Sequence, residues 1–91
     1  MDNDSINRVR VTIHGMEYTL RGSAPTSHLY AVAETVDKLM TEISNTSTYM
    51  DERRVAVLTA LNLADELERL KKEYYDLLSL LDEKTRGDAS S

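Results

Sequence analysis

The most informative absence in this sequence is cysteine, which does not occur among its 91 residues. Without cysteine the chain can form no disulfide and no thiolate metal site, a pattern typical of reducing compartments. Tryptophan and phenylalanine are also absent, so Leu, Val, Ile, Ala and Met must build the core. No apolar run approaches the roughly 20 residues that span a bilayer, and the start MDNDS is unlike a signal peptide. We therefore expect one small cytoplasmic domain without membrane insertion.

The charges are unevenly placed along the chain, with a local excess of positive charge near the N-terminus. The net charge is −5, yet residues 6–22 carry three arginines against one glutamate. Residues 27–52, in contrast, carry five acidic residues and one lysine. A chain that is acidic overall is a poor candidate for binding nucleic acid, because phosphate binding needs a basic surface. The stretch 6–22 is the one local exception.

The stretch VTIHGMEYTL, residues 11–20, alternates like a β-hairpin with His14-Gly15 as its loop. In that register the apolar side chains of both strands share one face, and a one-residue slip would scatter them. The predicted apolar pairs are Val9 with Leu20, Val11 with Tyr18, and Ile13 with Met16. Gly15 suits the positive φ of such a loop, and histidine tolerates it. Because an isolated hairpin is only marginally stable, we expect its apolar face to pack on helices.

Two helices are expected after the hairpin. The segment GSAPTS, residues 22–27, is a turn, and Pro25 suits the first turn of a helix that continues to about residue 44. The segment SNTSTYMD interrupts the pattern, and Asp51 is placed to be the N-cap of a second helix. No helix breaker follows before Gly87, so this helix should be roughly 34 residues and about 50 Å long.

These elements predict an α+β protein, in which an N-terminal β-hairpin packs on a short helix and a long C-terminal coiled-coil helix makes the chain oligomeric. The hairpin should occupy residues 7–21 and the first helix about 26–44. The expected boundaries are 6–60 for a globular head that includes the start of the long helix, 61–86 for a coiled-coil stem, and 1–5 and 87–91 for disordered ends.

A continuous apolar seam along the long helix predicts self-association. Its positions recur at steps of three and four over three heptads, as in a coiled coil. The seam comprises Ala60, Leu63, Leu67, Leu70, Tyr74, Leu77 and Leu81. Packing inside the monomer is the simpler interpretation, but the first helix is much shorter, which favours association between copies. Past Tyr74 the apolar face widens, which would suit a four-helix bundle. On the polar side, the spacing predicts the i,i+4 ion pairs Asp65–Arg69 and Glu68–Lys72.

Two segments of the chain resemble the ZapA family of bacterial division-ring proteins. They are VTIHGMEYTLRG, from residue 11, and RVAVLTALNLADELERLK, from residue 54, in the family's order of hairpin, helix and long helix. The short stem is similar to that of Gram-positive members. The resemblance implies a protein without catalytic activity or cofactor, whose head dimerises and binds the tubulin-like GTPase FtsZ at the mid-cell division ring. It also implies cross-linking of FtsZ filaments, and stems of longer relatives join two dimers into an antiparallel tetramer.

The resemblance and the charge pattern together give candidate binding residues. The polar face of the hairpin carries Arg10, Glu17 and Arg21, which would contact acidic FtsZ and steer its approach. An ordinary solvated sheet surface is the alternative for these side chains. Family contacts involve a charged position just after the hairpin glycine, where this chain departs with Met16, and one near the start of the long helix, at Arg53. We predict Arg10, Glu17, Arg21 and Arg53 as FtsZ-binding residues.

No pattern in the sequence predicts catalysis. His14 and His28 are the only histidines and lack the spacing of a metal site, and no phosphate-binding glycine loop or nucleophile motif occurs. Asn62 interrupts the apolar pattern of the long helix, and we expect it to have a structural role. The alternative to an FtsZ cross-linker is a generic coiled-coil adaptor whose head binds a different protein.

Overall fold

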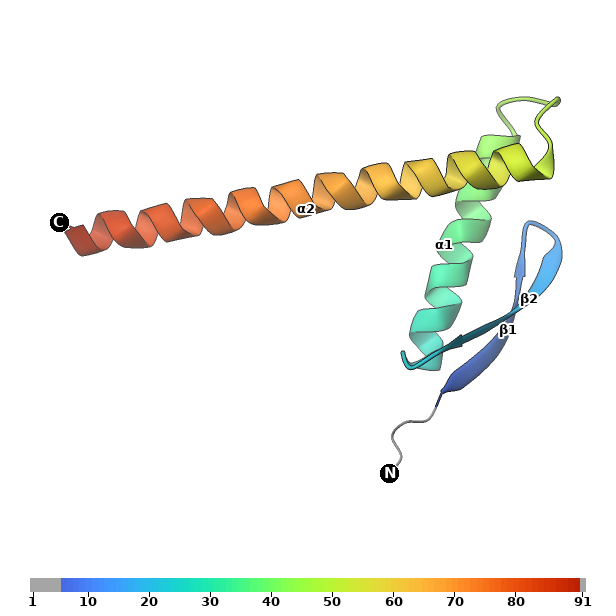
Figure 1. The fold of residues 1–91 in the computed structure, drawn as a ribbon, viewed down its shortest axis with the longest axis horizontal. Helices are drawn as coiled ribbons and strands as arrows, with labels where there is room; N and C mark the ends of the chain where they lie inside the picture. The colour runs from blue at the N-terminus through green and yellow to red at the C-terminus, as the bar shows by residue number, and fades with distance from the viewer. Residues whose placement is uncertain (1–5, 91) are drawn as a thin grey trace. The chain divides into compact units, whose positions relative to one another are not determined.

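The computed structural model describes residues 6–90, with side chains over residues 6–83. Along the chain lie β1 (Asn7–Ile13), β2 (Met16–Gly22), α1 (Thr26–Ser44) and α2 (Glu52–Ser90) (Figure 1). They divide into two compact units, the head up to Thr59 and the stem from Ala60 onwards. The order of a hairpin, a shorter helix and a long helix is the predicted one.

The strands β1 and β2 form an antiparallel hairpin in the predicted register. Its apolar pairs are Val9–Leu20, Val11–Tyr18 and Ile13–Met16. His14 and Gly15 both adopt positive φ, 51° and 81°, as the favoured two-residue hairpin turn requires. The conformation of this turn matches the twist of the flanking strands, so it fixes the register that places the apolar side chains on one face.

The helix α1 covers the β1 side of that apolar face (Figure 1). Ala33, whose small side chain lets the helix approach closely, is buried together with Val9 and Val11. The partly buried side chains around this cluster are Ile13, Leu20 and Leu29. Because α1 packs on β1, the expectation that the whole apolar face lies on helices is only partly right. Met16 and Tyr18 on β2 stay 53% and 46% exposed.

The first two turns of α2 belong to the head. Val55 and Thr59 lie there and are buried, as is Met40 on α1. The Thr59 hydroxyl donates a hydrogen bond of 2.8 Å to the carbonyl of Val55, which satisfies the polar group in its buried position. The head therefore has apolar side chains buried from the hairpin and from both helices.

The helix starts follow the sequence closely. Pro25 directly precedes α1 as its N-cap residue, one position outside the predicted first turn, and its carbonyl accepts hydrogen bonds from the amides of His28 and Leu29. Asp51 caps α2 as predicted, because its side chain accepts a hydrogen bond of 2.8 Å from the Arg54 amide.

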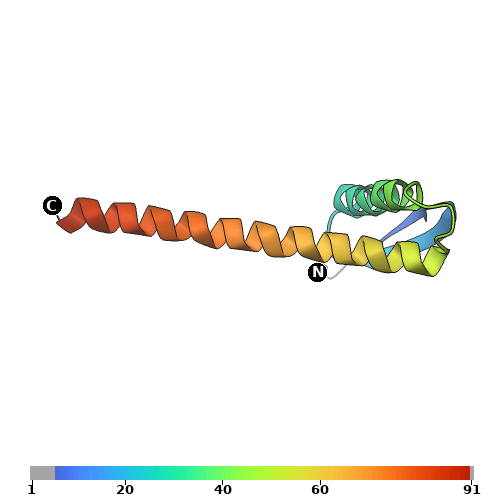
Figure 2. The same cartoon turned by 90° about the horizontal axis from the view of Figure 1, so that it is seen from above.

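The C-terminal end of α2 differs from the expectation. The helix has 39 residues and runs unbroken through Gly87 to Ser90 (Figure 2), where disorder was expected. A glycine inside a helix costs only about 1 kcal/mol relative to alanine, which is too little to end a long helix by itself. The expectation of disorder at residues 1–5 and 91 lies outside the described residues.

Candidate functional site

The hairpin brings three of the four predicted binding residues together. Arg10 lies on β1, and Glu17 and Arg21 lie on β2, all exposed on the face opposite the buried valines. The Arg10 guanidinium forms an ion pair with the Glu17 carboxylate at 2.9 Å. Glu17 therefore offsets the charge of Arg10, so only part of the hairpin's positive charge is available to a partner.

A third arginine, which was not predicted as a binding residue, shares this face. Arg8 on β1 lies directly opposite Arg21 on β2. Within residues 6–83 neither of these two side chains forms an ion pair. The positive charge of the hairpin is consequently strongest at its open end, away from the turn. The cross-strand register would have revealed this pair from the sequence.

Arg53, the fourth predicted residue, lies near the turn end of the hairpin, away from Arg21. It is exposed on the first turn of α2 and follows Glu52, whose carboxylate contacts the hairpin turn. Arg21 lies at the other end of the hairpin, since it pairs with Arg8 rather than with a residue beside the turn. The predicted set therefore does not form one cluster.

The hairpin turn has contacts that the sequence did not indicate. The backbone amide of His14 donates a hydrogen bond of 2.7 Å to the Asp37 carboxylate on α1. The imidazole Nδ1 lies 2.8 Å from the Glu52 carboxylate at the start of α2, and Nε2 lies 3.4 Å from the Ser44 hydroxyl. One residue thus links the turn to the middle and end of α1 and to α2. These partners are 23 to 38 positions away, so no local pattern could identify them.

The apolar seam of the stem is uncovered within the chain. Its side chains from Leu67 to Leu81 are 53–60% exposed, and only Leu63 is partly buried. The interpretation in which this seam packs inside the monomer is therefore wrong for the described residues. Next to the seam, Tyr75, Leu78 and Leu80 are exposed as well. The apolar surface is widest in this last part of the seam.

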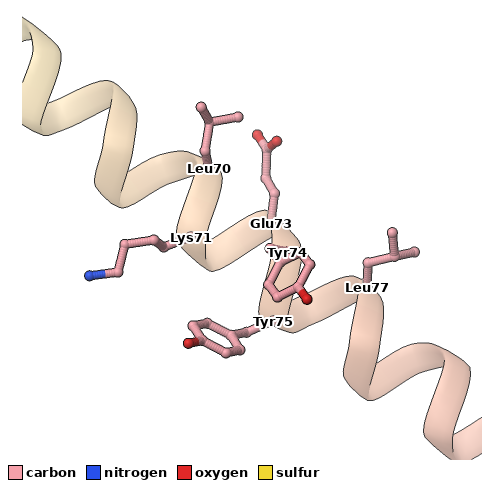
Figure 3. A pocket seen from close by; sticks show the side chains of 6 residues that line it. All are labelled: Leu70, Lys71, Glu73, Tyr74, Tyr75 and Leu77. Atoms are coloured by element: carbon pink, nitrogen blue, oxygen red, sulfur yellow. The ribbon is translucent and has the colours of Figure 1, made fainter. Parts of the chain in front are cut away.

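A shallow apolar hollow lies along this part of α2. It is lined by Leu70, Lys71, Glu73, Tyr74, Tyr75 and Leu77. Figure 3 shows these side chains bordering it on both sides of the helix, with Tyr74 between them. The rings of Tyr74 and Tyr75 meet edge to face with centroids 5.6 Å apart. Such a hollow on a single helix fits a side chain of another helix better than an enclosed small molecule.

The charged side of the stem pairs within the helix. Asp65 and Arg69 form the predicted i,i+4 ion pair. The predicted pair of Glu68 with Lys72 is wrong. Lys72 instead contacts Asp76 at 3.0 Å, and Glu68 lies 3.5 Å from Lys71. Lysine can reach an acid on either neighbouring turn, so spacing alone does not decide its partner.

Neither a metal site nor a membrane span is found in the part of the chain that the structure describes. No group of three His, Asp or Glu side chains there is placed to hold a metal ion. Within the same residues, no helix combines the length and the apolar character that crossing a bilayer requires. Asn62 is exposed on the stem.

Comparisons with known proteins agree with this architecture. A family model described as "Cell division protein ZapA" matches residues 9–87. The cell division protein ZapA of Geobacillus sp. (strain WCH70) is 43% identical over 74 residues, which cover 81% of this chain and 85% of that protein. The ZapA of Geobacillus thermodenitrificans (strain NG80-2) is 38% identical over 88 residues, covering 97% of each chain. Among solved structures, a ZapA mutant dimer from Geobacillus stearothermophilus is similar with a TM-score of 0.73 and 38% identity, covering 90% of this chain and 95% of that one.

Proposed function

Because the chain belongs to the ZapA family of cell division proteins, we propose that it is a non-enzymatic bacterial division protein that binds FtsZ through its head and cross-links FtsZ filaments. In this role it acts without a cofactor in the cytoplasm at the mid-cell ring, where it promotes assembly and stability of the ring. Its other partner is a second copy of itself.

The observation that carries this proposal is the uncovered seam of the stem. An isolated helix gains little stability in water from its own hydrogen bonds, and most helices depend on packing of an apolar face. Here no described residue of the chain covers the seam from Leu67 to Leu81. Pairing two stems as a coiled coil covers it and makes a homodimer, in line with the dimeric state of the similar Geobacillus stearothermophilus structure.

The widened end of the seam supports a further assembly step. A two-stranded coiled coil covers a narrow stripe, whereas Tyr75, Leu78 and Leu80 extend the apolar surface beyond it. Antiparallel association of two dimers through this end covers those side chains in a four-helix bundle. Such a tetramer carries heads at both ends and can bridge two filaments.

The head supplies the contact with FtsZ. Arg10, Glu17 and Arg21 lie on the exposed hairpin face, and Arg53 lies at the start of α2. The three arginines outweigh Glu17, and their excess positive charge favours encounter with an acidic filament and makes the association rate sensitive to salt. The chain as a whole is acidic, so this local excess directs which side of the molecule approaches FtsZ.

Co-sedimentation with purified FtsZ and GTP tests the proposal. The chain should pellet with FtsZ polymers, and less of it should pellet as salt is raised. Reversal of Arg10 and Arg21 to glutamate should lower pelleting, whereas Lys38→Glu, an exposed cation on α1, should not. A chain that never pellets with FtsZ would have to be treated as a generic adaptor for another protein.

Binding and bundling should also be separable. A chain ending at Lys71 keeps the head and loses the wide apolar end of the seam. It should pellet with FtsZ, more weakly because avidity is lost, and form few bundles in light scattering or electron microscopy. Full bundling by this truncated chain would show that the tetramer is not the cross-linking species.

A further inference from the structure

The outer edge of β2 offers unused backbone groups. The described sheet has two strands, so β2 pairs with β1 alone. Ile13–Met16, the pair beside the two-residue turn, is a hydrogen-bonded pair. From there along the hairpin, non-hydrogen-bonded and hydrogen-bonded pairs alternate. Glu17, Thr19 and Arg21 are therefore in non-hydrogen-bonded pairs, and their N–H and C=O groups point away from β1. Edges of this kind accept extended peptides as additional strands.

The apolar face beside this edge is also uncovered. Met16 and Tyr18 share a face with the buried valines of β1, yet about half of each side chain is exposed. The Tyr18 hydroxyl lies 3.9 Å from the Met16 sulfur, so the two side chains are neighbours along the strand. A strand placed next to β2 would set its own apolar side chains against this pair.

The polar face beside the edge has an excess of positive charge. Arg8 and Arg21 face each other in a non-hydrogen-bonded pair, where Cα atoms are only about 4.5 Å apart. Like charges placed directly opposite destabilise a hairpin. Neither guanidinium has an acidic partner within residues 6–83, whereas Arg10 is paired with Glu17. A carboxylate on a strand added beside β2 would lie next to Arg21 and would offset this repulsion.

We propose that the outer edge of β2 takes up an extended acidic segment of a partner protein as a third, antiparallel strand. Its carboxylates lie on the polar face beside Arg21, and its alternate apolar side chains lie over Met16 and Tyr18. A second hairpin of this chain fits less well, because it would bring three more arginines against one glutamate. The inference rests on the proposed role of the head in partner binding and specifies the form of the bound segment.

A labelled octapeptide of alternating aspartate and valine provides the probe, with fluorescence anisotropy against the full chain as the measurement. It should bind, and a lysine–valine octapeptide should bind at least tenfold more weakly. In the antiparallel arrangement the aspartates sit opposite Glu17, Thr19 and Arg21, so the aspartate amides point at β2. N-methylation of the aspartate amides should abolish binding, and N-methylation of the valine amides should leave it within about twofold. Equal effects of the two methylations would overturn strand addition.

Variants of the chain give the complementary test. Thr19→Pro removes an outward N–H without removing a hydrogen bond inside the hairpin. It should weaken binding of the aspartate–valine peptide at least tenfold, whereas Thr19→Val should leave this binding unchanged. The double substitution of Arg8→Glu and Arg21→Glu should weaken peptide binding to a similar extent. Should Thr19→Pro fail to fold, the methylated peptides decide on the unaltered chain. Folded Thr19→Pro could instead bind the peptide as before and sediment with a lower mass. That result would show that the edge of β2 pairs with a second copy of the chain, and it would overturn the proposal.

The outcome is distinguishable from that of the proposed function. A peptide that does not bind, beside a chain that still pellets with FtsZ, rejects the third strand and leaves FtsZ binding intact. If the chain binds the peptide but never pellets with FtsZ, the proposed function is rejected. The third strand then stands, with an acidic partner other than FtsZ.

Discussion

The head and the stem share one helix but hold it in opposite ways. In the head, Val55 on α2 is 1% exposed and Thr59 is 3% exposed, so the helix is fixed by a core that this chain builds itself. From Ala60 onwards, every described side chain except Leu63 is exposed. The head thus encodes its own packing, whereas the described part of the stem carries an apolar surface that this chain does not cover.

The polar contacts of the two regions differ in the same sense. In the stem, ion pairs join residues three or four positions apart, as in Asp65–Arg69. In the head, His14 contacts Asp37, Ser44 and Glu52, from distant parts of the sequence. Local pairs can be exchanged without changing the fold, whereas contacts between elements fix one arrangement. The head is therefore the part in which a recognition surface can be shaped.

The largest effect is expected where the head core is most buried. Val55→Asp places a charge at a position with 1% exposure and should destabilise the head by about 3–5 kcal/mol. The amides of β1 and β2 should lose their protection against hydrogen exchange. Val57→Asp, two residues along the same helix at a position with 52% exposure, is the matched control and should cost less than about 1 kcal/mol. Equal costs would mean that another chain completes the head core.

A smaller effect, confined to the stem, is expected from Leu70→Lys. The substitution places like charges across the seam of two paired stems and should weaken association at least tenfold, or about 1.4 kcal/mol. Sedimentation velocity should show the loss, while hydrogen exchange of the head stays unchanged. Ser79→Lys, on the side of the helix away from the seam, should leave the sedimenting mass as it is. An unchanged mass for Leu70→Lys would remove the seam as the association surface.

Sequence reasoning succeeded where one segment determines its own structure. The hairpin register follows from the alternation around His14-Gly15, and the start of α2 follows from the N-cap Asp51. Both depend on residues within a few positions of each other. The exposure of the seam was also predictable, because its heptad spacing identifies the apolar face without any knowledge of what covers it.

Contacts between elements were not predictable in this way. The links of His14 to both helices depend on how the hairpin docks, which no spacing specifies. The same holds for Met16 and Tyr18, which the alternation assigned to the covered face although α1 packs mainly over β1 and leaves these two side chains exposed. Among the candidate site residues, a shared face was predicted correctly for the hairpin, but the separation of Arg53 from Arg21 needed the three-dimensional arrangement.

An intermediate effect is expected at the hairpin turn, which joins the elements of the head. His14→Asn tolerates positive φ but loses the ring contacts with Glu52 and Ser44, at a cost of about 1 kcal/mol. His14→Val also strains the backbone, because a β-branched residue disfavours φ near 51°, and should cost about 1 kcal/mol more. Chemical denaturation of both variants measures the difference. Equal stabilities would show that the turn conformation is not under strain.

The smallest effect is expected for ion pairs on the surface, where head and stem should behave alike. The Arg10–Glu17 pair is 75% and 66% exposed, and the Arg69–Asp65 pair is 67% and 62% exposed. Double-mutant cycles with alanine should give coupling energies of a few tenths of a kcal/mol for each pair, decreasing as salt is added. A coupling well above that value in the head alone would mean that its surface pair is structurally required.

If the coupling is small, Glu17→Gln frees Arg10 at almost no cost in stability. The direction in which this substitution changes FtsZ pelleting then shows the role of Glu17. Stronger pelleting would show that Glu17 restrains the positive face, whereas weaker pelleting would show that Glu17 itself contacts the filament.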